Sequence, residues 1–224
     1  MKHKTLVPSS IVAAMAVTAP ALTAGAATSI YNTQASFNSN ATGSLVWSEG
    51  FSAYTPSGGF GSVSSPVSGL GDGSVSMSSS LGSLSTIKGN YYFGHITSTV
   101  MGVIENRQAT LSFANGVDSV GMEMYGTSTF SAGYFSEINY IVYAVGGGVL
   151  ASGSVTGNGG STSAYLGVVS DTPIGSLKFW GTQFSGALTS AIYADNVRGF
   201  QVPAPGAASV LGVAGLAAVR RRRR

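Results

Sequence analysis

Two apolar-rich runs and the glycines between them decide the fold: Ile138-Asn139-Tyr140-Ile141-Val142-Tyr143-Ala144-Val145, Gly146-Gly147-Gly148 and Val149-Leu150-Ala151-Ser152-Gly153-Ser154-Val155. The first run is rich in Val, Ile and Tyr, and both runs follow the two-residue alternation of a β-strand. Glycine readily adopts the positive φ angles that tight turns require. The stretch therefore predicts a β-hairpin.

The same alternation recurs through the second half of the chain, at residues 109–113, 120–125, 165–169, 177–180 and 191–200. Between residues 28 and 202 no segment carries a sustained 3.6-residue apolar stripe, although residues 33–41 are compatible with a short helix. We therefore predict an all-β fold made of two packed antiparallel sheets, a jelly-roll or lectin-like sandwich.

Glycine and serine dominate residues 56–85. Few apolar side chains remain there to offset the conformational entropy that is lost on ordering. We expect long loops around one or two strands in this segment.

Composition and charge narrow the classes of function. The chain has 224 residues, 44% of them hydrophobic, which is enough for one domain with a sizeable core. Between residues 28 and 202 four basic residues face eight acidic ones, a net charge of −4, so we expect no nucleic-acid partner. The chain has no cysteine, which excludes disulfides, thiol catalysis and Cys-ligated zinc.

The N-terminal segment, residues 1–26, has the layout of a secretory signal peptide. Lys2 and Lys4 precede an apolar run at residues 11–22, and small residues at 24–26 follow it. The alternative is a buried N-terminal helix, but Pro20 and the small residues favour removal by signal peptidase. Residues 27–201 then form the exported body, the ectodomain.

The C-terminal segment, residues 202–224, has three parts. Val202, Pro203, Ala204 and Pro205 are followed by an apolar run at residues 206–219 and by five arginines: Arg220, Arg221, Arg222, Arg223 and Arg224. Residues 204–219 contain no charge, and a helix of that length spans about 24 Å, close to the thickness of a bilayer core. Because clustered arginines stay on the cytoplasmic side, we predict a C-terminal transmembrane helix with a cytoplasmic stop.

This arrangement resembles the sorting tail of bacterial PEP-CTERM proteins, which combines a proline-containing motif, a transmembrane helix and an arginine cluster. Here Ala204 stands where that motif usually has Glu. The resemblance implies processing by an exosortase-type enzyme after a transient membrane stage. It also implies a final location at the cell surface or outside the cell.

Parts of the ectodomain are also similar to PEP-CTERM ectodomains: residues 164–174, 177–179 and 194–197, with an acidic-aromatic step at residues 49–51. In that group these segments form paired strands of a shared sandwich. The resemblance implies that fold and brings no established activity with it.

The sequence gives little support for a catalytic site. His3 belongs to the signal segment and His95 stands alone, so neither a Ser–His–Asp triad nor a histidine-clustered metal site is indicated. Paired carboxylates, as in glycoside hydrolases, remain available, but the sequence cannot place two of them across a groove. We predict that the protein is not an enzyme.

Asp195 is a charged residue within an apolar strand, which is costly unless the carboxylate is paired or coordinated. Carbohydrate-binding sandwiches often hold a structural calcium between a first-strand Glu and a last-strand Asp, and Glu49 with Asp195 fits that arrangement. The alternative is that Asp195 pairs with Arg198 or caps a loop. No other cofactor is indicated.

Several aromatic residues form a candidate sugar-stacking platform, with Trp180, Tyr91 and Tyr92 foremost. Such residues also fill sandwich cores. The sequence as a whole predicts an exported structural or adhesive protein of the cell surface or extracellular matrix. The alternatives are a module that binds extracellular polysaccharide and, third, a glycoside hydrolase.

Overall fold

The structure, a computed structural model, describes residues 27–91, 94–103, 107–128, 137–156, 163–181 and 190–202. The expected signal peptide, the membrane run at 206–219 and the arginine cluster lie outside these residues. Among the residues described, no helix is long and apolar enough to cross a membrane.

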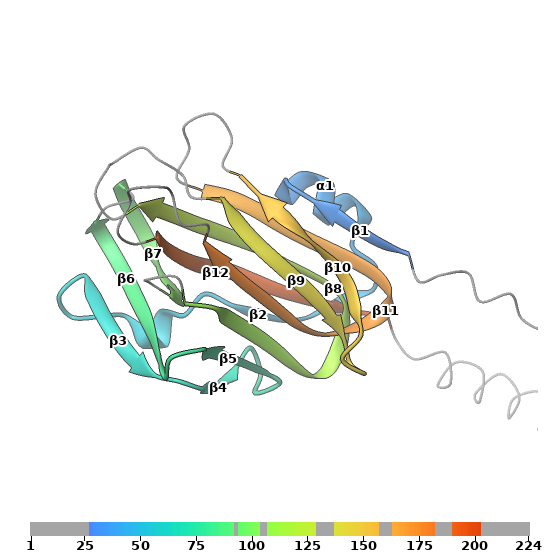
Figure 1. Ribbon diagram of the computed structural model, residues 1–224, viewed down its shortest axis with the longest axis horizontal. Helices are drawn as coiled ribbons and strands as arrows, with labels where there is room; N and C mark the ends of the chain where they lie inside the picture. Colours follow the sequence, from blue (N-terminus) through green and yellow to red (C-terminus); the bar gives the residue numbers. More distant parts are fainter. Residues whose placement is uncertain are drawn as a thin grey trace, which may run out of the picture.

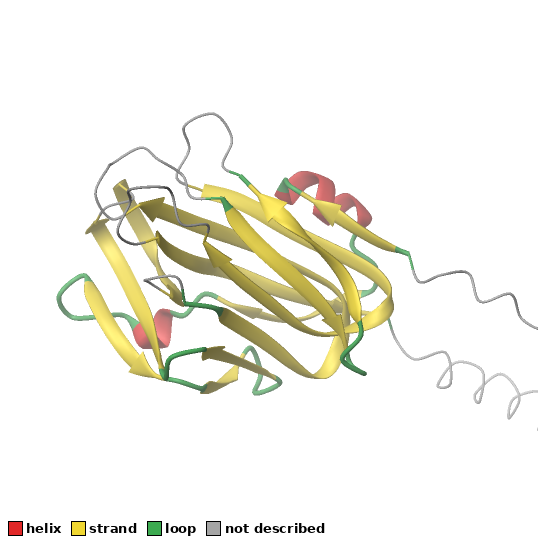
Figure 2. Ribbon diagram, in the orientation of Figure 1, coloured by secondary structure: helices red, strands yellow, loops and turns green. Residues whose placement is uncertain are grey.

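The described chain is mostly antiparallel β-sheet, as the alternation predicts (Figures 1 and 2). The first strands are β1 (Thr28–Tyr31), β2 (Ser44–Glu49), β3 (Phe60–Ser64), β4 (Val67–Leu70), β5 (Val75–Ser79) and β6 (Ser83–Tyr91). The remaining strands are β7 (Gly94–Val103), β8 (Ala109–Ser128), β9 (Ile138–Ala144), β10 (Val149–Val155), β11 (Ser163–Gly181) and β12 (Ser190–Gln201). The predicted hairpin is β9 and β10.

Two long strands, β8 and β11, tie the sheet together. Residues 109–113 of β8 pair with β5 and with the second half of β11, whereas residues 119–128 pair with β12 and the first half of β11. The paired strands therefore form two groups, which we call limbs. The β12 limb contains β1, β2, β3, β6, β7 and β12; the β9 limb contains β4, β5, β9 and β10; β8 and β11 run through both.

One hydrophobic core takes side chains from both limbs. Met122 and Ala194 come from the β12 limb, and Leu111, Leu177 and Val142 come from the β9 limb; all five are fully buried. A smaller cluster, formed by Ile87, Val100, Ala191 and Tyr193, is separate from it.

The helical content is small. Helix α1 (Gln34–Asn40) begins after Thr33, whose hydroxyl accepts a hydrogen bond from the backbone N–H of Ser36 and so caps the first turn. A 3-10 turn, η1 (Ser52–Tyr54), follows β2. Residues 33–41, which are compatible with a short helix, contain one over residues 34–40.

The expectation of long loops at residues 56–85 is wrong. This segment contains β3, β4, β5 and the start of β6. In β5 Val75 and Met77 are buried and alternate with half-buried serines, so even a serine-rich strand supplies one apolar side to the core.

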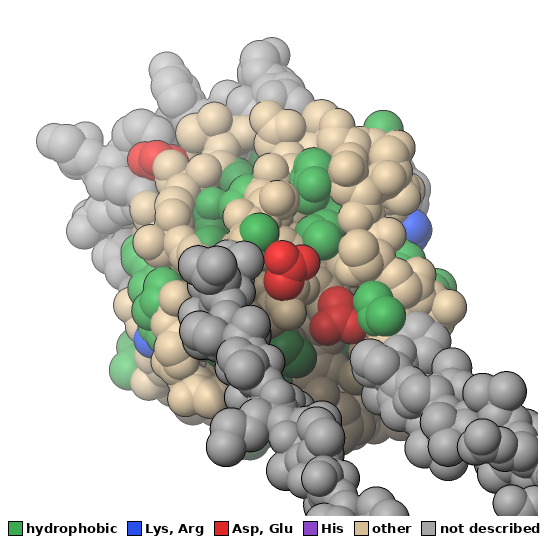
Figure 3. Space-filling view, turned by 90° about the vertical axis from the view of Figure 1, so that its right-hand side faces the viewer, with side chains coloured by type: hydrophobic (Ala, Val, Ile, Leu, Met, Phe, Trp, Pro, Cys, Tyr) green, Lys and Arg blue, Asp and Glu red, His purple; other side chains and the backbone are tan. Residues whose placement is uncertain are grey.

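Charges are sparse on the surface. At the end of the molecule seen in Figure 3, acidic side chains lie near the middle and at the upper left, and cationic ones lie at the left and right margins. An approaching anion therefore meets few positive groups on this side.

Candidate binding surface

The outer side of the β9 limb carries a continuous polar surface. Along β5, β8 and β11, buried apolar residues alternate with half-buried polar ones, so every second side chain points away from the core. We define the hydroxyl face as the outward residues Ser76, Ser78, Thr110, Ser112, Tyr143, Ser176 and Lys178.

Strand register arranges these side chains in two rows. The first row crosses β5, β8, β11 and β9 through Ser76, Ser112, Ser176 and Tyr143. The second crosses the same strands through Ser78, Thr110, Lys178 and Ile141. Neighbouring strands lie about 4.8 Å apart, so each row presents hydroxyl groups at a regular short spacing.

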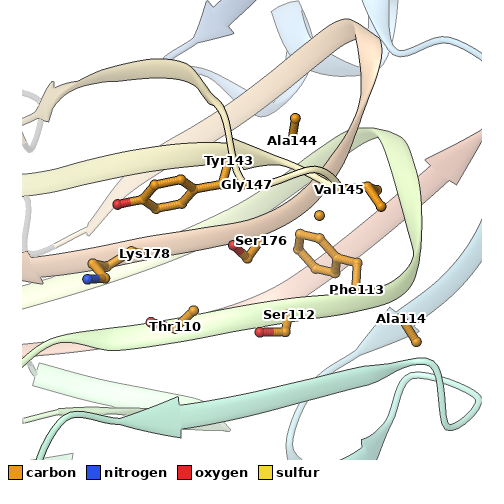
Figure 4. Close-up of a pocket in the computed structure, with 11 residues that line it drawn as sticks. Thr110, Ser112, Phe113, Ala114, Tyr143, Ala144, Val145, Gly147, Ser176 and Lys178 are labelled. Atoms are coloured by element: carbon orange, nitrogen blue, oxygen red, sulfur yellow. The ribbon is translucent and has the colours of Figure 1, made fainter.

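A groove of about 520 Å³ lies over part of this face (Figure 4). Its floor includes Thr110, Ser112 and Ser176, and the β9–β10 hairpin contributes its rim at Val145 and Gly147. In Figure 4 the Tyr143 and Lys178 side chains extend toward the same side of the groove. The groove thus combines hydroxyl groups, one ammonium and two aromatic rings, that of Tyr143 and that of the buried Phe113.

Lys178 provides the positive charge of the groove. Within the described part of the chain its ammonium has no hydrogen-bond or ion-pair partner, and the groove lining contains no acidic residue. The ammonium is therefore available to an anionic ligand.

The aromatic residues expected to bind sugar lie in different places. Trp180 is half-buried on β11 and stands opposite Asn139, one row beyond Lys178. Tyr91 ends β6 in the other limb, and Tyr92 lies outside the described residues. Trp180 and Tyr91 therefore belong to different strands, β11 and β6, which do not pair with each other, and Tyr143 is the half-buried aromatic residue that lines the groove.

Glu49 and Asp195 lie on neighbouring strands, because β2 pairs with β12 and Glu49 stands opposite Val197. The Glu49 carboxylate accepts hydrogen bonds from the backbone N–H groups of Phe51 and, at 3.0 Å, Gly71. It thereby joins β2 to the turn between β4 and β5. Further lone pairs of the carboxylate remain for another ligand.

Asp195 is fully buried, and its Oδ1 accepts a hydrogen bond of 2.8 Å from the N–H of Asn196. Asn196 has a φ of 47°, and the pairing of β12 with β8 shifts register beside it. Asp195 thus accepts a hydrogen bond from the backbone at an irregularity of β12. Calcium binding stays a prediction; among the described residues no three His, Asp or Glu side chains gather as a metal-binding group.

A second polar cluster lies on the side of the β12 limb that faces away from the core. Glu123 stands opposite Asp195 on β12 and opposite Tyr165 on β11. The Tyr125 hydroxyl donates a hydrogen bond of 2.9 Å to Glu123, and burial together with the Glu123 charge raises the pKa of Tyr125 above its usual value.

Tyr165 completes this cluster. Burial raises its pKa to about 12, while the Arg198 charge lowers it and the Glu123 charge raises it. Its buried hydroxyl has no hydrogen-bond partner among the described residues. The cluster is therefore a place where buried phenols are held neutral.

Two other candidate positions are only partly described. His95 lies on β7 opposite Asn90. The N–H of Val202 donates a hydrogen bond of 2.6 Å to Asp118, which ties the end of β12 to β8, whereas Pro203, Ala204 and Pro205 lie outside the described residues.

No protein-family model matches the chain, and no curated protein matches it by sequence. The K1 cleaved adhesin domain of Lys-gingipain from Porphyromonas gingivalis W83 is 14% identical, with a TM-score of 0.38, over 72% of this chain and 100% of that domain. The arabinose-bound α-L-arabinofuranosidase MgGH51 is 13% identical, with a TM-score of 0.37, over 73% of this chain and 28% of that enzyme.

Proposed function

We propose that the protein is an exported structural or adhesive component of the cell surface or extracellular matrix, and that the hydroxyl face is its contact surface. The observation that carries this proposal is the face itself, with five Ser or Thr hydroxyls, one tyrosine and one lysine in register and no acidic residue. Such a surface offers many hydrogen bonds and no paired acid and base.

The fold that we propose for the body is a β-sandwich of the jelly-roll or lectin-like type. The larger hydrophobic core supports it, because residues from both limbs bury their apolar side chains in it. The two strands β8 and β11 would then pass from one layer to the other at their bends.

Export and sorting complete the proposal. A signal peptide delivers the chain, the run at residues 206–219 and the arginines hold it in the membrane, and an exosortase-type enzyme acts near Pro203-Ala204-Pro205. Because alanine offers no charge where glutamate is usual, we propose a variant sorting enzyme.

Sorting predicts a processed C-terminus. In cells that contain the sorting enzyme, mass spectrometry of the mature protein should find a new end near residues 203–205, and the protein should be at the surface or in the medium. In cells that lack the enzyme, the protein should stay in the membrane fraction with Arg220–Arg224 attached. A native chain found in the cytosol with both ends intact would contradict the proposal.

A carbohydrate-binding module is the second candidate, and the groove over the hydroxyl face favours it. A glycoside hydrolase is less well supported. Glu123 and Asp195 stand opposite each other, but the Asp195 side chain is fully buried and a substrate cannot reach its carboxylate. This pair of carboxylates therefore gives no support to a hydrolase.

Structural calcium at Glu49 and Asp195 is proposed as a stabilising ligand. Calcium at about a hundred times its dissociation constant should stabilise the fold by about 2.7 kcal/mol, or roughly 5–10 °C in melting temperature relative to EDTA. Asp195→Asn should remove the calcium response, whereas Asp72→Asn, at an exposed turn, should keep it. An identical melting temperature of the parent protein in calcium and in EDTA would end this proposal.

A further inference from the structure

We propose that the groove over the hydroxyl face binds a strand of acidic polysaccharide, with Lys178 pairing with a sugar carboxylate and the Tyr143 ring contacting the face of a neighbouring sugar. This inference rests on the proposed function, because it names the class of matrix molecule that the contact surface takes.

The positive charge of the groove favours an anionic ligand. The body between residues 28 and 202 has a net charge of −4, so an anionic chain is repelled by most of the surface. The groove is different, because Lys178 lies there without a partner among the described residues and without a lining carboxylate. A carboxylate in the groove can therefore form a charge-assisted hydrogen bond to Lys178.

The two rows of hydroxyl groups favour binding of a sugar over binding of a simple anion. Each Ser or Thr hydroxyl both donates and accepts, which matches the hydroxyl groups of a sugar ring. Ser112 and Ser176 stand side by side in one row, and Thr110 stands next to Lys178 in the other. A ligand whose carboxylate reaches Lys178 therefore has hydroxyl partners on both rows.

The hairpin at the rim argues against phosphate as the preferred anion. Phosphate sites use several free backbone N–H groups, as in a nest. Here the N–H groups of Ala144 and Gly147 are bonded within the hairpin, and that of Val145 is bonded to the carbonyl of Pro173. A single ammonium among hydroxyls suits a sugar carboxylate better than a phosphate.

The size and form of the groove suit part of a chain. A volume of about 520 Å³ lies in the range of small-molecule sites, roughly 300–1,000 Å³. Val145, at the rim of the groove, is 61% exposed. A long polysaccharide can thus lay a few of its sugars across the hydroxyl face and continue beyond it.

Binding of polygalacturonate tests the proposal, with fully methyl-esterified polygalacturonate as the matched neutral probe. The full chain, purified in mild detergent, should bind the acidic polymer at least about tenfold more tightly than the ester at low salt, as measured by titration calorimetry. The preference should shrink as salt rises, because ions screen the Lys178 charge.

Two pairs of variants test whether the polymer binds at Lys178 and Tyr143. Lys178→Gln should weaken binding of the acidic polymer by about tenfold, whereas Lys88→Gln, the same change at an exposed position of β6, should leave it within about twofold. Tyr143→Ala should weaken binding of both polymers, and Tyr143→Phe should retain it, with melting temperatures showing that each variant is folded.

Three results would overturn the inference: no binding of polygalacturonate, equal binding of polymer and ester, or equal effects of Lys178→Gln and Lys88→Gln. If one of these occurs while the mature protein is still found in the matrix, the inference fails and the proposed function stands. If the purified chain binds but cells keep it in the cytosol, the proposed function fails instead.

Discussion

Replacing Phe37 with alanine is expected to lower the free energy of unfolding by about 3–5 kcal/mol, the usual loss when a buried phenylalanine is truncated. Phe37 lies on α1 and is fully buried. Its ring centroid lies 6.5 Å from that of Tyr31, 5.8 Å from that of Tyr165 and 5.6 Å from that of Phe200. The substitution therefore removes the centre of an aromatic cluster.

The neighbouring strands cannot easily fill the space left by this ring. Phe37 lies over Gly121 and Gly167, which stand opposite each other on β8 and β11. A Cβ atom at Gly167 would lie 2.6 Å from Phe37 Cδ2, so glycine is needed here for close approach. With no side chains at these two positions to move inward, the cavity persists and the loss should be at the upper end of the range.

Chemical denaturation of the parent and of three variants would measure this effect. Phe37→Leu should lose less than Phe37→Ala, because it keeps much of the apolar volume. Asn38→Ala, at the exposed next position of α1, should change the free energy of unfolding by less than about 0.5 kcal/mol. A loss below about 1 kcal/mol for Phe37→Ala would show that α1 does not pack on the sheet as described.

The alternation of apolar and polar residues predicts where strands lie. It does not predict that two such segments belong to one long strand. Residues 109–113 and 120–125 belong to the single strand β8, and residues 165–169 and 177–180 belong to β11. The polar segments between them look like turns in the sequence, but β8 and β11 continue through them as single strands, although the pairing of the two strands shifts register there. Such bends depend on pairing between distant segments, which local sequence does not contain.

The candidate site shows the same limit. Trp180 is a candidate sugar-stacking residue in the sequence and is half-buried on β11, whereas nothing in the sequence distinguishes Tyr143 and Lys178. Each of them is one polar position in an alternating strand. The register of β9, β11 and β8 places Tyr143 and Lys178 beside three hydroxyl groups. That register cannot be inferred from the sequence of one strand alone.

Raising the pH from 10 to 12 is expected to destabilise the protein through Tyr165 and Tyr125. The folded state raises both pKa values, so it keeps these phenols protonated where the unfolded chain ionises them. Stability from this source is fully present below pH 10 and falls as the pH rises through the raised pKa values. For Tyr165, 8% exposed with a pKa of about 12, the loss should be about 2 kcal/mol.

Variants separate the two phenols in guanidinium unfolding curves at pH 8, 10, 11 and 12. Tyr165→Phe removes a buried hydroxyl that lacks a partner among the described residues, so it should be neutral or stabilising at pH 8 and should flatten the alkaline loss. Tyr125→Phe should also flatten the loss, but it should lower stability at pH 8, because it removes the hydrogen bond to Glu123. An alkaline slope in Tyr165→Phe equal to that of the parent would show that this phenol is not held neutral by the fold.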